Sequence, residues 1–192
     1  MAKKKNVDLP IQRYRDKIIG IRSAIGALNG ATPEVKRSVY EWAVIALYAA
    51  IEELFLEAFT AAINRDPTHV SASKGVSFPK HMTVAMCRYL IVGDGYFGFR
   101  DRDALKKKCK AFLGDGHDLI AELNGDRPAV ALEVMTADRN YAAHQSAWAK
   151  EKLRRVLKKR GLLGAKGLST AGAYLSAIDS SAAWTTPLAV QT

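Results

Sequence analysis

Residues 138–148, with the sequence DRNYAAHQSAW, contain three side chains that could together act on a phosphodiester. Cleavage of RNA without a metal needs a base for the 2′-hydroxyl proton, an acid for the 5′-oxygen and a cation that stabilises the charge of the phosphorane. His144 suits the proton transfers because histidine titrates near neutral pH. Arg139 suits the charge stabilisation because its guanidinium is permanently charged and binds phosphate through two parallel hydrogen bonds. The amide of Asn140 could hydrogen-bond the phosphate or orient the imidazole.

The spacing of these three residues has a consequence if they lie on a helix. Asn140 and His144 then project from nearly one face, about 40° apart, whereas Arg139 lies about 140° from His144. One helix cannot easily bring Arg139 and His144 to the same phosphate, but two copies facing each other across a two-fold axis could, which favours a homodimer. The same residue types are also typical of an ordinary helix C-terminus, where cations suit the negative end of the helix dipole. The spacing alone leaves both interpretations open.

The sequence offers little for other chemistries. His69 stands in a polar stretch and His117 among acidic neighbours, and both are interpreted as surface residues; His81 could touch phosphate, cap a helix or be exposed. Cys87 and Cys109 lie in unrelated segments without metal-ligand spacing, so we expect free thiols in a reducing compartment. Phosphate-binding loops, dinucleotide fingerprints and hydrolase or zinc-protease motifs are not found, so no metal and no cofactor are expected.

Basic residues dominate the charge, with 29 Lys and Arg against 19 Asp and Glu and a net charge of +10. An excess of this size favours a polyanionic partner. Basic runs occupy residues 3–5, 106–110 and 150–160; one alone is typical of a solvated helix face, but three favour RNA, DNA or another phosphate-rich surface. Tyr141 and Trp148 flank the motif and could stack on bases, although packing at the helix turn is the favoured interpretation. The residues expected to contact RNA are Lys150, Lys152, Arg154, Arg155, Lys158 and Lys159.

Helical patterns dominate the sequence, and the alternation typical of strands is missing. Thr32-Pro33-Glu34 predicts the start of a long helix. Threonine is a favoured N-cap residue, proline suits the first helical position, and glutamate is favourable in the first turn. Ser146 offers an N-cap for a basic helix, and residues 65–79 are expected to form a loop. The predicted helices cover about residues 9–29, 33–64, 80–92, 102–113, 115–123, 126–144, 147–160 and 169–179. This pattern indicates an all-α fold, an up-and-down helical bundle with short extra helices.

The long helix expected at about 33–64 carries an apolar stripe at three- and four-residue spacing. Glu53 falls opposite this stripe and should be solvated, whereas Glu52 lies on its flank, about 80° from Val44. A carboxylate at the edge of a buried face needs a partner, so Glu52 is a candidate supporting residue. The residues of the stripe are Val44, Tyr48, Ile51, Phe55, Ala58, Phe59 and Ala62.

Membrane insertion and secretion are not expected. The longest apolar run, about residues 43–63, carries the carboxylates of Glu52, Glu53 and Glu57, which argue against a transmembrane helix. The N-terminal sequence MAKKKNVDLP has basic residues but no apolar region after them, so it does not read as a signal peptide. A soluble, cytoplasmic protein without membrane contact is therefore expected.

The segment RNYAAH (139–144) resembles the signature of the HEPN superfamily, an arginine commonly followed by asparagine and then a histidine after a short helical spacer. YAAIEELFLEAF (48–59) resembles the apolar, Glu-bearing early helix of these domains. KEKLRRVLKKRGLL (150–163) resembles the basic helix that often follows the motif in the RiboL-PSP-HEPN branch. The likeness extends over about residues 35–163. In many relatives a glycine directly follows the histidine, where this chain has Gln145.

The resemblance implies a fold and a domain organisation. Residues 1–164 are expected to form a single helical bundle of HEPN type. Beyond the likeness, small residues dominate after Gly164, so residues 165–192 are expected to form a small-residue C-terminal segment with a short helix and a loose end.

The resemblance also implies an activity, that of a metal-independent endoribonuclease working as a homodimer. Arg139, Asn140 and His144 take the catalytic roles, and Glu52 is the supporting carboxylate. Because such proteins act in toxin–antitoxin, antiviral-defence and RNA-processing settings, the expected partners are RNA and an antitoxin or defence-system protein. The alternatives left open are a non-catalytic HEPN module that binds nucleic acid or regulates a partner, and a purely structural helical scaffold.

Overall fold

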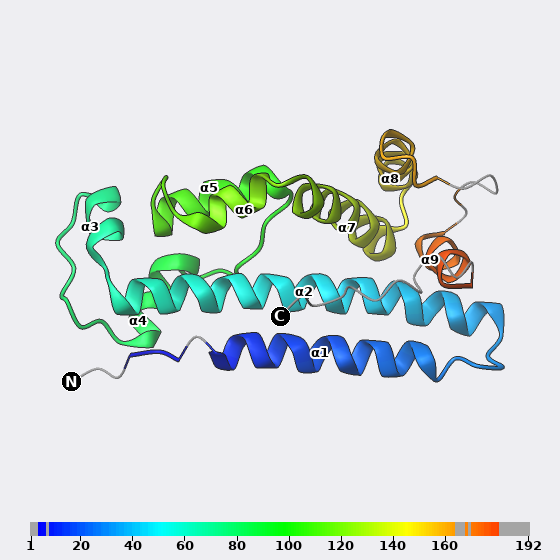
Figure 1. Cartoon of the computed structure of the whole chain (residues 1–192), viewed down its shortest axis with the longest axis horizontal. Coiled ribbons are helices and arrows are strands. Elements are labelled where there is room, and N and C mark those ends of the chain that lie inside the picture. The colour runs from blue at the N-terminus through cyan, green and yellow to red at the C-terminus, as the bar shows by residue number, and fades with distance from the viewer. Residues whose placement is uncertain (1–3, 7, 164–167, 169, 181–192) are drawn as a thin grey trace. The chain divides into compact units, whose positions relative to one another are not determined.

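The computed structural model describes residues 4–6, 8–163, 168 and 170–180. Within these ranges the chain forms helices and no strand, which confirms the all-α prediction (Figure 1). None of the described helices is both long enough and apolar enough to cross a membrane. The helices are α1 (Asp8–Gly26), α2 (Pro33–Arg65), α3 (Thr68–Lys74), α4 (Val84–Val92), α5 (Arg102–Leu113), α6 (Asp118–Asn124), α7 (Asp126–His144), α8 (Ala147–Lys159) and α9 (Ala171–Ser180).

Side-chain caps set where several of these helices begin. Thr83 Oγ1 accepts a hydrogen bond from a backbone N–H of the first turn of α4 at 3.2 Å, so α4 starts later than the predicted residue 80. His117 Nδ1 accepts from the first turn of α6 at 3.1 Å, and that helix likewise starts later than predicted. Ser146 caps α8 as predicted, with its Oγ accepting from a first-turn N–H at 3.2 Å.

The stretch 65–79 contains α3, so the prediction of a loop there is wrong. Asp66 Oδ1 accepts a hydrogen bond from the backbone N–H of Thr68 at 2.9 Å, which stabilises the turn that opens the helix. Val70 is the buried residue of α3, and Gly75 ends the helix with a φ of 65°. A helix with one buried residue has no apolar periodicity, which is why the sequence pattern gave no helical signal.

The chain gathers into two compact units. The first unit comprises Met1–Ile18 and Ala49–Glu133, and the second comprises Ile19–Tyr48 and Val134–Thr192. The boundaries between them fall inside α1, α2 and α7. That residues 1–164 act as a single domain stays a prediction.

An aromatic cluster forms part of the core of the first unit. Phe59 of α2 is fully buried, and the rings of Phe55, Phe97 and Phe112 lie 6.0, 5.7 and 5.5 Å from it between centroids. Such tilted and edge-on pairs stabilise beyond the area that they bury. The two cysteines of this unit are buried and free, as predicted, and burial raises the pKa of Cys109 to about 11.

Within the first unit, α2 is buried more widely than the predicted stripe. Glu57, outside the stripe, is 3% exposed, whereas Ala58, inside it, is exposed. The Glu57 carboxylate is compensated by Lys5 Nζ at 2.5 Å and by Arg88 Nη1 at 2.6 Å. A buried charge is tolerated when it is paired and hydrogen-bonded in this way, and a periodicity argument cannot foresee pairing from other segments.

An apolar cluster shared by α7, α8 and α9 forms the core of the second unit. Leu153 and Leu157 of α8 are fully buried in it, and the hydroxyl of Tyr174 donates to the carbonyl of Leu162 at 2.8 Å. The helix predicted at about 169–179 is confirmed as α9, while the loose end predicted beyond it lies outside the described residues. The buried members of the cluster are Ala137, Tyr141, Ala142, Ala149, Leu153, Leu157, Ala171 and Tyr174.

Gly172 lets α9 approach the backbone of α2. A Cβ at this position would lie 2.1 Å from the carbonyl oxygen of Arg37, closer than any real contact. The N–H of Gly172 donates to Glu41 Oε1 of α2 at 3.4 Å. Glycine is therefore required here for packing, although it is a poor helix former.

We expect Gly172→Ala to lower the free energy of unfolding by about 1–3 kcal/mol, the usual cost of overpacking. The matched control is Gly20→Ala in α1, where no atom of the described residues, apart from the local backbone of α1, lies within 4 Å of the added Cβ. That change should raise the free energy of unfolding by about 0.5–1 kcal/mol through helix propensity. Urea unfolding of both variants measures the two values. Stabilisation by Gly172→Ala would contradict the close approach.

Candidate functional site

The last turns of α7 have a buried side and an open side. The three predicted catalytic residues are not part of the buried side: Arg139 and Asn140 are half-buried, and His144 is exposed. Tyr141 is 6% exposed, which confirms packing rather than base stacking as its role. The buried residues of these turns are Thr136, Ala137, Asp138, Tyr141 and Ala142.

Arg139 and Asn140 are brought together by the structure. Arg139 Nη1 donates to Asn140 Oδ1 at 3.0 Å, and the guanidinium carbon lies 5.2 Å from the centroid of the Tyr48 ring of α2. The ring and the amide hold the guanidinium in place, while its remaining N–H groups are left for other acceptors. His144 forms no hydrogen bond with either side chain in the described part of the chain. Within one copy of the chain, two of the three predicted catalytic residues are therefore in contact.

Gln145 ends α7 in the left-handed conformation, with a φ of 45°. This is the position where the HEPN pattern often has glycine, which adopts positive φ without steric cost. For other L-residues the left-handed conformation costs roughly 1–2 kcal/mol. In this chain Gln145 Nε2 donates to Glu41 Oε2 at 3.3 Å, which offsets part of that cost. Glutamine therefore occupies the turn that glycine would favour, and His144 stays in the last turn of the helix.

The variants Gln145→Gly and Gln145→Ala test this turn. Both variants lose the hydrogen bond to Glu41. Only the alanine variant keeps the steric cost of a left-handed backbone conformation at residue 145. We expect Gln145→Gly to be more stable than Gln145→Ala by about 0.5–1 kcal/mol, measured by denaturant unfolding. An alanine variant as stable as the glycine variant would show that residue 145 does not hold a positive φ.

Asp138 is a buried carboxyl beside the motif. Its side chain is 3% exposed, and its Oδ1 has no hydrogen-bond partner among the residues that the structure describes. Burial, with the Glu41 carboxylate nearby as a second cause, raises the pKa of Asp138 to about 7. Burial and the Asp138 carboxylate also raise the pKa of Tyr174 in α9. Asp138 therefore lies among groups of α2 and α9, and near neutral pH it is divided between its two protonation states.

We expect Asp138→Asn to remove a pH dependence of stability. The pKa of this carboxyl rises from an ordinary 3.8 to about 7 on folding, so the unfolded chain loses the proton first. The wild type should therefore lose stability relative to Asp138→Asn as the pH rises from about 4 to about 7, and the gap should stay constant above that. A shift of about three units corresponds to at most about 4 kcal/mol. Thermal unfolding of both proteins between pH 4 and pH 8 measures the gap; a gap that does not vary with pH would contradict the burial of an ionisable carboxyl.

Helix α8 presents cations to solvent. Four of the six residues predicted to contact RNA are exposed, and Lys150 and Lys152 are half-buried. Glu151 pairs loosely with Arg154 at 3.7 Å and with Arg155 at 3.9 Å, contacts that are worth little on an open surface. The four exposed residues are Arg154, Arg155, Lys158 and Lys159.

Glu52, the predicted supporting carboxylate, lies in the first unit. It is half-buried, as predicted for the flank of the stripe, and its Oε1 accepts from the backbone N–H of Phe99 at 3.3 Å. Gly98 permits this approach, since a Cβ there would lie 3.0 Å from the same oxygen. The contacts of Glu52 thus hold the aromatic turn after α4, and a role in catalysis stays a prediction. The cavity beside it, of about 320 Å³, is lined by Ala49, Glu52, Glu53, Leu56, Arg88, Val92, Gly95, Tyr96 and Phe97.

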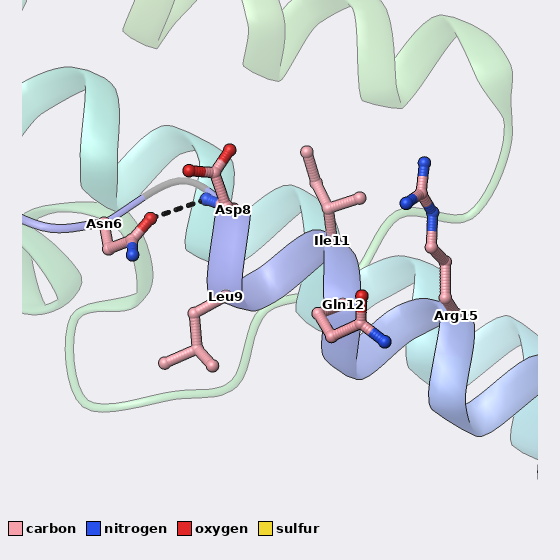
Figure 2. Close-up of a pocket in the computed structure, with 6 residues that line it drawn as sticks. All are labelled: Asn6, Asp8, Leu9, Ile11, Gln12 and Arg15. Atoms are coloured by element: carbon pink, nitrogen blue, oxygen red, sulfur yellow. Dashed lines mark hydrogen bonds between the residues drawn. The ribbon is translucent and has the colours of Figure 1, made fainter.

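A second hollow, of about 410 Å³, lies against the first turns of α1 (Figure 2). Figure 2 shows Asn6 Oδ1 accepting from the backbone N–H of Asp8, a bond of 2.8 Å that starts the helix. The side chains of Ile11 and Arg15 project from the same side of the helix in this view. No predicted site residue lines this hollow, so it is not part of the candidate site.

The acidic residues beside the motif were missed by the sequence analysis. Asp138 is three and four residues before the buried Tyr141 and Ala142, which is the spacing of one helix face. Glu41 lies about 60° from Val44 around the axis of α2, which places it beside the apolar stripe of this helix. Both signals are present in the sequence, but Glu41 lies outside the apolar middle of α2, which supplied the candidate carboxylates.

The second unit therefore combines a permanent cation, a titratable imidazole and a helix with exposed basic residues. This combination suits a phosphodiester ligand. Among the described residues, no group of three or more His, Cys, Asp or Glu side chains is arranged to hold a metal ion. No protein-family model, curated protein or solved structure significantly matches this chain.

Proposed function

We propose that this protein is a metal-independent endoribonuclease of HEPN type that acts as a homodimer. The observation that carries the proposal is the polar edge of α7, where Arg139 and Asn140 pair at 3.0 Å and the exposed His144 ends the helix. Helix α8 follows this edge after a two-residue connection and offers exposed cations for the RNA backbone. The resemblance of residues 139–144 to the HEPN signature supports the same activity.

In the proposed reaction, the 2′-oxygen attacks the phosphorus and the bond from phosphorus to the 5′-oxygen breaks. The products are a 2′,3′-cyclic phosphate and a 5′-hydroxyl. A neutral imidazole takes the 2′-hydroxyl proton, and an imidazolium gives a proton to the leaving oxygen. Two copies of the chain supply two His144 side chains, one in each form, while Arg139 stabilises the charge of the phosphorane. Asn140 holds the Arg139 guanidinium through the 3.0 Å hydrogen bond.

RNA cleavage in EDTA by the wild type and by His144→Ala tests the activity. We expect the wild type to cut and the variant to be slower by about 10²- to 10⁴-fold, the usual contribution of one acid–base group. End-group analysis should find 2′,3′-cyclic phosphate or 3′-phosphate. His81→Ala, another exposed histidine, is the matched control and should cut at the wild-type rate. Full activity of His144→Ala, or a strict metal requirement, would refute the proposal.

A mixed dimer tests the two-copy site. Two differently tagged copies, one wild type and one His144→Ala, can be purified together. Since the proposed reaction uses both histidines, the mixed dimer should be as inactive as a dimer in which both copies carry His144→Ala. A mixed dimer with half the wild-type rate would show that each copy cuts by itself.

The second candidate function is a non-catalytic module that binds nucleic acid or regulates a partner protein. The exposed cations of α8 favour it, because they could bind a polyanion without any chemistry at Arg139 or His144. This module would bind RNA in a salt-sensitive way and would cut none of the RNAs offered.

A further inference from the structure

Trp148 is an exposed aromatic side chain next to the candidate site. Its side chain is 65% exposed, so the packing role favoured from the sequence is wrong. The buried side of α8 consists of Ala149, Leu153 and Leu157, which lie about 100–180° around the helix from Trp148. The indole therefore projects away from the core of the second unit. A single exposed aromatic side chain is common on protein surfaces, so the case for a ligand depends on the residues that share its helix face.

Three basic residues share the face of Trp148. Lys152, Arg155 and Lys159 follow at spacings of four, three and four residues, and all lie within about 40° of Trp148 around the helix. The ammonium of Lys152 lies 5.3 Å from the centroid of the indole, so a cation already occupies part of this surface. Trp148 and these three residues form the basic stripe of α8, which is about 16 Å long at 1.5 Å per residue. This length spans about four or five nucleotides at about 3.4 Å each.

The aromatic end of this stripe is the end nearer to the motif along the chain. Only Gln145, with its positive φ, and the cap Ser146 separate α7 from α8. Trp148 lies in the first turn of α8, and Lys159 is the last residue of the helix. Trp148 is therefore the member of the stripe nearest to His144 along the chain.

We propose that Trp148 is a stacking platform for an unpaired base of single-stranded RNA, with the phosphates that follow held by Lys152, Arg155 and Lys159. The inference rests on the proposed function, because it assigns a binding subsite to the same substrate. Aromatic side chains stack on any base, since every base has a π-face, and basic residues that track the backbone add affinity without reading sequence. Duplex RNA keeps its bases stacked on one another, so the platform selects single strands.

Binding of a labelled single-stranded RNA to the full chain tests the platform. His144→Ala serves as the background, so that the RNA is not cut. Adding Trp148→Ala should weaken the affinity by about 5- to 100-fold, the range of one lost stacking contact. The slope of affinity against salt should not change, because no phosphate contact is removed. Arg155→Ala should instead lower that slope by about 0.7, the value for one phosphate contact of a single strand.

Two controls separate stacking from general effects of the substitution. Trp42→Ala removes another exposed tryptophan of the second unit, which shares its helix face with Val35 and Ile45 rather than with cations, and should leave the affinity unchanged. Duplex RNA should bind equally well with and without Trp148. A chain with Trp42→Phe and Trp184→Phe keeps Trp148 as its single tryptophan, and single-stranded RNA should quench the tryptophan emission.

The outcomes distinguish this inference from the proposed function. If the His144→Ala background binds single-stranded RNA and Trp148→Ala binds it equally well, the platform is refuted and RNA binding stands. If Trp148→Ala lowers only the thermal stability, the contact with Lys152 is an intrahelical pair and nothing more. If the His144→Ala protein binds no RNA at any salt concentration, both the proposed function and the stacking platform are refuted.

Discussion

The contact between α7 and α8 is the constraint on which the candidate site depends. Tyr141 and Ala142 of α7 share one apolar cluster with Leu153 and Leu157 of α8. Burial of these side chains rotates both helices about their axes to a fixed orientation, since turning either helix would expose its apolar side. The orientation then decides which polar residues reach solvent. His144 at the end of α7 and the basic stripe of α8 are exposed because the opposite sides are buried.

In the second unit, the carboxyls of Asp138 and Glu41 lie among α2, α7 and α9, whereas four cations of α8 are exposed. Asp138 is buried with the Glu41 carboxylate nearby, a placement that disfavours the charged form of Asp138. Glu41 is partly compensated, because it accepts hydrogen bonds from Gln145 and from the backbone of Gly172. The cations of α8 lie on the solvent side. A polyanion would meet the cations, while the carboxyls remain within the fold and connect α2, α7 and α9.

The side chains that carry the proposed chemistry differ in how firmly the fold holds them. Arg139 is held by the ring of Tyr48 and the amide of Asn140, so its guanidinium is oriented before any ligand arrives. Such preorganisation lowers the entropic cost of binding an anion. His144 and Trp148 are exposed on either side of the turn between α7 and α8. In the proposed reaction, these two exposed side chains are the ones that meet a flexible RNA strand and a second copy of the chain.

The sequence by itself determined the helical class, the long α2, the cap of α8 at Ser146 and the position of the motif at the end of α7. These features depend on contacts within about four residues of the chain, which periodicity and capping rules describe. It missed α3, whose single buried residue gives no periodic signal. Only the tertiary structure decided that Asp138 is buried beside Glu41, that Trp148 is exposed and that Gly172 lies against the backbone of α2. Burial depends on segments far apart in the sequence, and no local pattern states which segments will meet.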